Sequence, residues 1–219
     1  MMKYIVAVVI GIIAYIIYFN CNYDLGQEQD LSRTAFLLWI DRKRVLLIAL
    51  FWAVALPVTW LFSFYGYGPL KTVRYCLLLA FLFPIAREDA RTKQIPNRWL
   101  IYLYVIRIVI FILETVYYPS SFADNLIFTI SGGIVCGGIM FIAYVVSRHA
   151  VGMGDVKLFM ILGFYLGTSM TYTVMFAASA LAALYGVCHM AAKKIKMRDE
   201  IAFAPFIAVA ALIVIVMGF

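Results

Sequence analysis

Charged residues, and acidic residues above all, are scarce in this chain. Only 13% of its 219 residues are charged, 66% are hydrophobic, and the mean hydropathy is +0.98. Soluble domains are nearer to half apolar and a quarter charged, so this composition leaves no room for a soluble catalytic domain and predicts a polytopic membrane protein. Only eleven residues are Asp or Glu. An aspartate fixed where a polar turn meets an apolar helix is therefore a candidate for function.

The cysteines form no pattern that would hold a metal or a redox centre. The four of them are far apart, and none belongs to a Cys-x-x-Cys pair: Cys21, Cys76, Cys136 and Cys188. Zinc sites and thioredoxin-like sites need closely spaced thiols. A free thiol within an apolar run behaves as a small hydrophobic side chain. We therefore predict no metal and no cofactor.

Eight apolar stretches predict an all-α, polytopic transmembrane helical bundle that forms one integral membrane domain over residues 1–219. A bilayer core of about 30 Å takes about 20 apolar residues, or fewer where a helix is short. The residues Gly167-Thr-Ser169 divide one long apolar run, and because such residues do not compel a break, 156–190 can form two spans or one. The predicted spans are 4–19, 45–65, 72–86, 99–118, 125–147, 156–168, 171–190 and 201–219.

The basic residues set the orientation of these eight spans. Of the 18 Lys and Arg residues, Lys3, Lys71 and Arg74 fall on one side, Arg107 lies in mid-span, and all the others fall on the opposite side. The positive-inside rule makes the richer side cytoplasmic, with both termini outside and 20–44 as a cytoplasmic or interfacial connection. Basic clusters beside apolar runs are typical of anchors at an anionic bilayer surface, so the net charge of +7 predicts no nucleic-acid partner.

Two aspartates stand at the ends of predicted spans on the same, cytoplasmic side. Asp89 follows the apolar run 77–86, and Asp155 ends the tetrapeptide Gly152-Met-Gly-Asp. Two such carboxylates suggest paired acid–base chemistry. Each also has a purely structural interpretation. Asp155 can be the N-cap of the next helix after a glycine turn, and Asp89 can cap a turn or pair with neighbouring basic side chains.

Three motifs occur in a fixed order over residues 85–219. They are Asp89-Ala-Arg-Thr-Lys-Gln-Ile-Pro-Asn97, Gly152-Met-Gly-Asp-Val-Lys-Leu158 and Ile201-Ala-Phe-Ala-Pro-Phe206. Together they resemble the type IV prepilin peptidases, which belong to the Gly-x-Gly-Asp membrane aspartic peptidases. The resemblance implies that Asp89 and Asp155 are the catalytic pair. It also implies that nearby residues bind the substrate or shape the site: Pro96, Asn97, Gly152, Gly154 and Lys157.

The resemblance implies a defined reaction and location. Family members cut the short basic leader of a type IV prepilin or pseudopilin after its final Gly, at the cytoplasmic face of a prokaryotic inner membrane. One carboxylate acts as base on a water molecule while its protonated partner polarises the scissile carbonyl. Larger members have an extended cytoplasmic region after the first span and also N-methylate the product. Because only 20–44 stands there and no Cys-x-x-Cys is present, the resemblance extends to a short-form peptidase and gives no support to methyltransferase activity.

Two other classes of function stay open at this stage. One is a small transporter that uses the two aspartates for protons or cations, and the other is a non-catalytic membrane protein of pilus assembly. Neither aspartate is placed near mid-bilayer, and no broken helices recur in two halves, which disfavours the transporter.

For three further features a structural explanation is favoured over a functional one, or is as good as one. Arg107 and Glu114 are seven apart in one span and predict an intramembrane ion pair that fixes packing. His149 is predicted to be a solvated loop residue, and Lys157 can equally be an interfacial anchor. Glu88 competes with Asp89 as the acid of the first motif, but the distance to Ile95-Pro-Asn97 favours Asp89.

Overall fold

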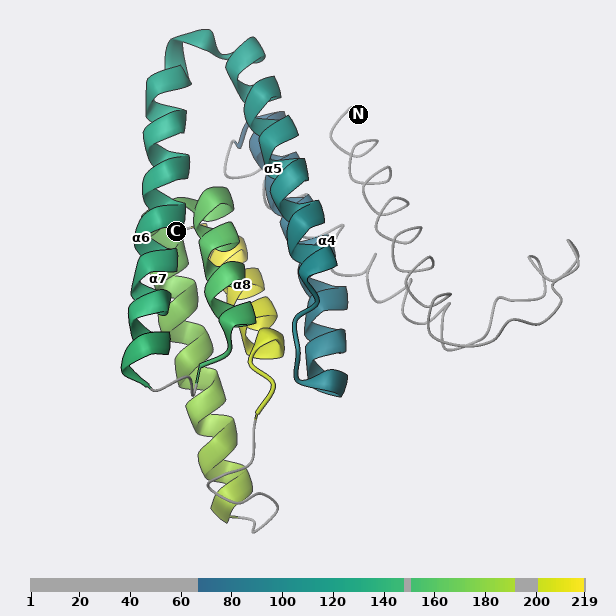
Figure 1. Ribbon diagram of the computed structural model, residues 1–219. Coiled ribbons are helices and arrows are strands. Elements are labelled where there is room, and N and C mark those ends of the chain that lie inside the picture. The colour runs from purple at the N-terminus through teal and green to yellow at the C-terminus, as the bar shows by residue number, and fades with distance from the viewer. Residues whose placement is uncertain (1–66, 148–150, 192–200, 219) are drawn as a thin grey trace, which may run out of the picture. The chain divides into compact units, whose positions relative to one another are not determined.

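The computed structural model describes residues 67–147, 151–191 and 201–218, and every regular element in these ranges is a helix. Contacts divide the chain into two compact units, residues 1–80 and 81–219, with the boundary inside α4. The predicted spans 4–19 and 45–65 and the 20–44 connection lie outside the described residues. The elements are α4 (Pro69–Thr92), α5 (Asn97–Tyr117), the 3-10 turn η1 (Pro119–Ser121), α6 (Phe122–Val146), α7 (Met153–Ala191) and α8 (Ala204–Met217) (Figure 1).

Four of the described helical segments are long and apolar enough to cross a membrane: α4, α5, η1 with α6, and α7. The predicted spans 72–86, 99–118 and 125–147 fall on the first three of these. α8 is apolar but has only 14 residues. The predicted all-α membrane fold is therefore confirmed for the described residues. The total of eight spans and the side on which the termini lie stay predictions.

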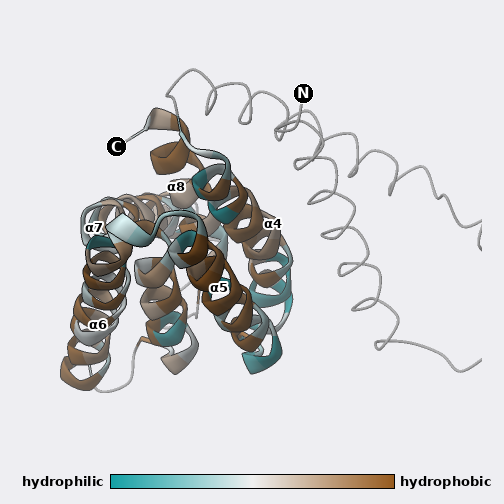
Figure 2. Ribbon diagram, turned by 90° about the horizontal axis from the view of Figure 1, so that it is seen from above, coloured by the Kyte–Doolittle hydropathy of each residue, from teal (hydrophilic) through white to brown (hydrophobic). Residues whose placement is uncertain are grey.

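Apolar side chains cover the outside of the second unit as well as its core. Trp99, Phe81, Phe159 and Tyr165 are among the largest fully buried side chains. Figure 2 shows hydrophobic colour along most of the length of the helices and hydrophilic colour mainly near their ends. Exposed hydrophobic residues recur on α5 at helical spacing, which is the surface expected of a helix that faces lipid. They include Ile101, Val105, Ile108, Ile112 and Val116.

α7 is two helices joined at Gly167, whose backbone is not helical (φ 74°, ψ −178°). The ring of Phe159, in the first half (153–166), has its centroid 6.1 Å from that of Phe203. The ring of Tyr185, in the second half (168–191), has its centroid 5.3 Å from that of Phe206. A straight helix would separate residues 159 and 185 by about 39 Å. Phe203 and Phe206 are only three positions apart and could not contact both residues at that separation. The chain therefore reverses at Gly167 (Figure 1), and the predicted break at 167–169 is present.

Glycine permits the close packing of α6 on the first half of α7. A methyl group at Gly132 would collide with the carbonyl oxygen of Gly163 and would lie 2.8 Å from the Cα of Gly167. A methyl group at Gly163 would in turn collide with the carbonyl of Gly132. Small residues that let two backbones meet in this way are a common means of packing membrane helices, where burial of apolar surface gives little gain.

Candidate active site

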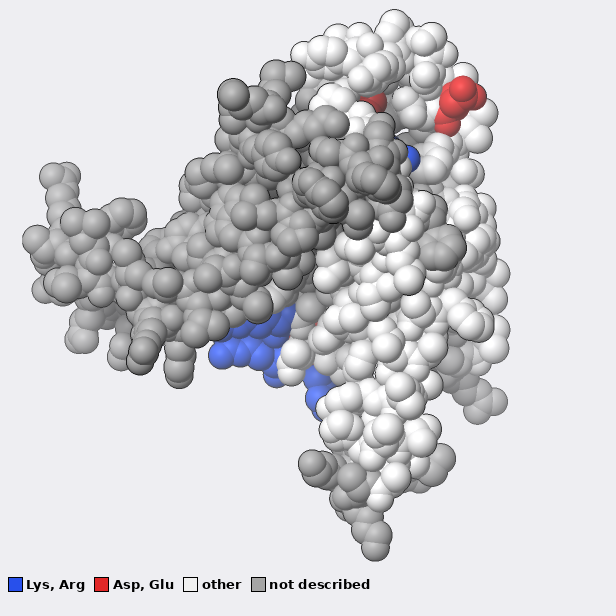
Figure 3. All heavy atoms as spheres, turned by 180° about the vertical axis from the view of Figure 1, so that it is seen from behind, with Lys and Arg blue, Asp and Glu red and all other residues white. Residues whose placement is uncertain are grey.

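All three sequence motifs meet at one end of the second unit. The last turn of α4, the first turns of α5 and α7, and the segment that enters α8 lie toward the same end (Figure 1). Most of the Lys and Arg atoms visible in Figure 3 lie in the lower half of that view, which is the same end, and the visible Asp and Glu atoms lie near the top. The basic residues in the motif segments of this unit, or within two residues of them, are Arg87, Arg91, Lys93, Arg98 and Lys157.

Asp89 lies in the last turn of α4 and is buried, with 5% of its surface exposed. The helix ends because Lys93 adopts a left-handed conformation (φ 54°) and donates its N–H to the carbonyl of Asp89 at 2.7 Å. The carboxylate of Asp89 accepts the backbone N–H of Ala204 through Oδ2 at 2.9 Å. A carboxylate from α4 thus caps the first turn of α8, where the helix dipole and the free N–H groups favour negative charge.

Asp155 is the third residue of α7 and is partly buried. The carbonyl of Gly152 accepts the N–H groups of Asp155 (3.1 Å) and Val156 (3.4 Å), so Gly152 occupies the capping position. The interpretation of Asp155 as the N-cap itself is therefore wrong. Its carboxylate instead reaches back to the backbone of Gly152, as the acidic residue of a capping box does.

The two aspartate segments pack directly against each other. A methyl group at Gly154 would lie 3.0 Å from the Cβ of Ile95, so the absence of a side chain there lets the first turn of α7 approach the 93–96 connection. Lys157 Nζ donates to Asn97 Oδ1 at 3.0 Å across the same junction. The charge of Asp89 acts on the carboxyl of Asp155. The structure thus brings together the segments that carry the two predicted catalytic residues.

The other predicted site residues have defined positions in this junction. Pro96 is the N-cap of α5, with φ −67° and ψ 131°, and α5 begins at Asn97, between the predicted spans 72–86 and 99–118. Neither Gly152 nor Gly154 has a positive φ. A methyl group at Gly152 would lie 3.1 Å from Asp155 Oδ2. Both glycines therefore permit close packing: Gly152 against the carboxylate of Asp155, and Gly154 against Ile95.

Glu88 is engaged in a structural contact that holds the start of α5. Its Oε2 accepts the indole N–H of Trp99 at 2.7 Å, and its Oε1 accepts Arg98 Nη2 at 3.1 Å. Trp99 is fully buried. Because both oxygens of Glu88 have these partners, the geometry favours Asp89 as the acid of the first motif.

One element of the candidate site was not assigned a role from the sequence. The backbone of Phe203 and Ala204 binds the carboxylate of Asp89. The Ile201-Ala-Phe-Ala-Pro-Phe206 motif was the available signal, but it has no polar side chain to indicate what it does. Pro205 follows in the first turn, where its missing N–H has no intrahelical partner to lose. This motif therefore acts through its backbone.

Within the part of the chain that the structure describes, no group of three or more His, Cys, Asp or Glu residues is arranged to hold a metal ion. The absence of a metal and of a cofactor stays a prediction. His149 lies outside the described residues.

Two neighbouring carboxyl groups, one of them buried, can carry out acid and base chemistry together. Removal from water disfavours the charged form of a carboxyl, and a second negative charge nearby disfavours it further. Such a pair can share one proton, so that one member accepts a proton while the other donates one.

The fold and the site define an all-helical membrane protein with paired aspartates at one end of its helices, and the comparisons agree with this class. The model of the type IV leader peptidase family matches residues 76–187. The chain belongs to this family. A prepilin leader peptidase/N-methyltransferase of Bacillus subtilis is 28% identical over 149 residues, which is 65% of this chain and 54% of that relative. The chain thus spans about half the length of that curated relative. No solved structure matches significantly.

Proposed function

We propose that this protein is a membrane aspartic endopeptidase that removes the leader of type IV prepilins or pseudopilins. The observation that carries the proposal is the junction of the Asp89 and Asp155 segments in a member of the leader peptidase family. The substrate has a short basic leader that ends in Gly and precedes an apolar helix. The enzyme cuts after this Gly, and the product enters a type IV pilus or a related secretion system.

Asp89 and Asp155 carry the reaction as a pair. One carboxylate removes a proton from the attacking water, and the other, protonated, donates a hydrogen bond to the scissile carbonyl oxygen. The hydrogen bond from Ala204 to Asp89 Oδ2 fixes one member of the pair, and the first turn of α7 fixes the other. Two carboxylates held in this way need little reorganisation when the substrate arrives.

The basic residues support a cytoplasmic position for the site. Five Lys and Arg residues lie in the described motif segments or within two residues of them, near the two aspartates. Residues 117–124 and 167–171, toward the opposite end, contain none. By the positive-inside rule the aspartate end faces the cytoplasm. A leader peptide that has not been translocated is presented on this side, in the inner membrane of a prokaryote.

The test is cleavage by the purified full-length protein in detergent or liposomes. A prepilin-type substrate should give one cut after the leader Gly, identified by mass spectrometry. Asp89→Asn and Asp155→Asn keep the side-chain shape, and an amide oxygen at residue 89 can still accept from Ala204. Each should abolish turnover while the protein stays folded, because residues that act as a unit fail together.

Two matched acidic substitutions serve as controls. Glu88→Gln should be milder than either aspartate variant, since Glu88 contacts Trp99 and Arg98. Asp124 lies in the first turn of α6, at the end of the unit opposite to the two aspartates, so Asp124→Asn should leave turnover unchanged. If Asp89→Asn is active and Glu88→Gln is not, the assignment of the pair is wrong. If the folded protein cleaves no Gly-ended leader, the peptidase proposal fails.

A further inference from the structure

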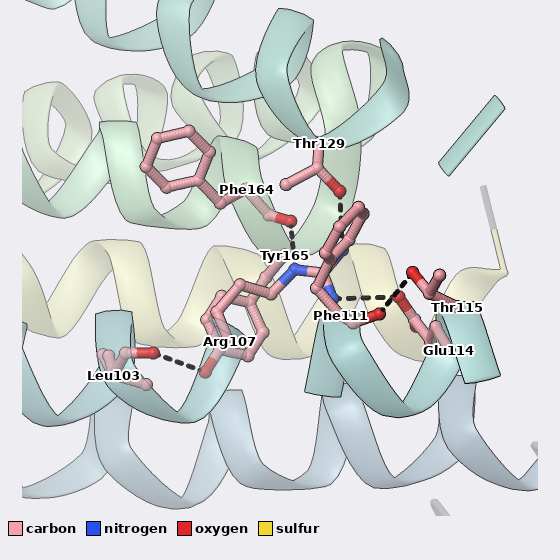
Figure 4. Close-up of polar contacts among 8 residues, drawn as sticks. All are labelled: Leu103, Arg107, Phe111, Glu114, Thr115, Thr129, Phe164 and Tyr165. Atoms are coloured by element: carbon pink, nitrogen blue, oxygen red, sulfur yellow. Dashed lines mark hydrogen bonds and ion pairs between the residues drawn. The ribbon is translucent and has the colours of Figure 1, made fainter. Parts of the chain in front are cut away.

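A buried ion pair lies in the second unit, more than two helical turns from the aspartates along α5. Arg107 and Glu114 on α5 are 3% and 5% exposed, and Arg107 Nη1 lies 3.0 Å from Glu114 Oε2. The predicted pair is therefore present. Arg107 also donates from Nη2 to Thr129 Oγ1 of α6 at 2.6 Å and from Nε to the carbonyl of Phe164 of α7 at 2.7 Å (Figure 4). One side chain thus connects three helices.

The Phe164 carbonyl needs a donor from outside its own helix. In a continuous helix this oxygen would accept the N–H of residue 168. The backbone at Gly167 is extended in ψ (−178°), so the helical path stops before that residue. A carbonyl left without its helical donor at a buried helix end costs about 1–3 kcal/mol if nothing replaces it. Arg107 supplies the replacement, and its positive charge lies at the negative end of the helix dipole.

Three contacts fix α5 and the first half of α7 side by side in one register. Near the aspartate end Lys157 binds Asn97, farther along Tyr165 Oη donates to the Leu103 carbonyl at 2.8 Å, and Arg107 binds Phe164. The partners are 60, 62 and 57 residues apart in sequence. A nearly constant separation shows that the two helices run parallel. The exposed contact lies beside the aspartates. The buried Tyr165–Leu103 contact and the partly buried Arg107–Phe164 contact lie at the far end of the short helix.

We propose that Arg107, with Glu114 as its counter-charge, is a positioning residue that sets how far the first half of α7 is shifted along α5. Asp155 begins this half, and Asp89 is joined to α5 by only the 93–96 connection. The axial position of this half therefore sets the position of Asp155 relative to Asp89. The proposal rests on the peptidase function proposed above, in which the two carboxylates must meet the same scissile bond.

The energetics of buried ion pairs separate positioning from simple stabilisation. Replacing both members of a buried pair by apolar side chains of similar volume is often neutral for stability, because the cost of desolvating the charges is removed with their attraction. The Phe164 carbonyl, however, loses its fixed donor in such a variant. The double variant Arg107→Met with Glu114→Leu should therefore fold, while the first half of α7 loses one of its three register contacts and is held less firmly at one position along α5.

Kinetics of the double variant test the proposal. We expect kcat to fall about 100-fold, which is the loss that a misplacement near 1 Å can cause, with KM unchanged because the leader-binding surface is intact. Arg107→Lys with Glu114 retained, which keeps the charge and a donating ammonium group, should have a higher kcat than the double variant. Thr115→Val removes a hydroxyl that bonds only to the Phe111 carbonyl in the same view (2.9 Å, Figure 4). It should leave kcat unchanged.

A distance measurement makes the test independent of the peptidase activity. Spin labels at Ala90→Cys and Met153→Cys, both exposed positions, should give one narrow distance distribution in an otherwise cysteine-free protein. Adding Arg107→Met with Glu114→Leu should broaden or shift it, and Thr115→Val should not. If the double substitution changes the distance distribution but the wild-type protein cleaves no leader, the peptidase function is refuted and the positioning role stands. An unchanged distribution, or unchanged kcat in the folded double variant, would overturn the positioning role.

Discussion

Replacement of Gly132 by Ala should destabilise the protein, whereas the same replacement at Gly138, six residues along α6, should not. Gly132 is buried against the first half of α7, and its added methyl group would collide with the carbonyl oxygen of Gly163. The nearest other atom would be the Gly167 Cα at 2.8 Å, against an ordinary contact of 3.4–4 Å. Gly138 is exposed, and a methyl group there meets nothing within 4 Å.

The magnitude follows from what must move. Restoring ordinary contact to the Gly167 Cα alone requires a shift of about 0.6 Å, the difference between 3.4 and 2.8 Å. The atoms that must give way are backbone atoms of two packed helices, so no side-chain rotation can absorb the shift. Overpacking of this kind costs about 1–3 kcal/mol. Both variants gain the same preference of Ala over Gly in a helix, so the difference in unfolding free energy between them isolates the steric cost.

The assay is reversible unfolding in detergent micelles, followed by circular dichroism, with wild type and both variants measured side by side. We expect Gly138→Ala to equal or exceed wild type and Gly132→Ala to fall below Gly138→Ala by about 1–3 kcal/mol. Gly132→Ala should also lose turnover, because α6 packs on the half-helix that carries Asp155. Equal stability of the two alanine variants would refute the close backbone contact between α6 and α7.

Three further predictions concern the aspartate end. Lys93→Gly should raise the unfolding free energy by about 1 kcal/mol, since Lys93 holds a left-handed conformation (φ 54°) that glycine adopts without strain; an unchanged thermal unfolding profile would contradict this. Gly154→Ala should reduce turnover with little loss of fold, because its methyl group would push Ile95 away by a few tenths of an ångström; undiminished kcat would show that this contact does not matter. A single cysteine at Thr92 should react with membrane-impermeant reagents only from the cytoplasm, and one at Ser120 only from outside. Reaction of both from one side would contradict the proposed topology.

Sequence reasoning was sufficient where the determining residues are close together in the chain. Pro96 restricts its own φ and the residue before it, so the boundary between α4 and α5 could be placed from three residues. Gly167 marked a point where the long apolar run can divide, because glycine adopts φ values that other residues avoid, although the sequence left one span or two open. The glycines before Asp155 indicated a helix start there, although the helix begins two residues earlier than the N-cap interpretation of Asp155 placed it. Each of these features depends on local backbone conformation.

Contacts between distant segments could not be predicted in the same way. The donor for Asp89 Oδ2 is a backbone N–H 115 residues away. Because nearly every residue has a backbone N–H, the residue type at 204 gives no sign of this bond. The ion pair of Arg107 and Glu114 was predictable from their spacing on one helix, but the bond to the Phe164 carbonyl was not, because it depends on how α5 and α7 pack. Glu88 was ambiguous until its bonds to Trp99 and Arg98 were seen.

The reversal at Gly167 is what allows the third motif to reach the first. Between Asp89 and Asp155 the chain crosses the unit twice, by α5 and α6, and therefore returns to the aspartate end. A straight α7 of 39 residues would extend about 58 Å away from it, and Ala204 could not bind Asp89.

Gly167→Ala tests this argument directly. Its φ of 74° with ψ of −178° is a region that only glycine adopts without strain, at a cost of about 1–3 kcal/mol for other residues, and the added methyl group would collide with the ring of Phe128. We expect lower stability and loss of turnover together. Gly186→Ala is the matched control in the second half of α7, since its methyl group would meet only the side-chain end of Ile201 at 3.5 Å. If Gly167→Ala keeps both stability and turnover while Gly186→Ala does the same, the reversal at this glycine does not hold the site together.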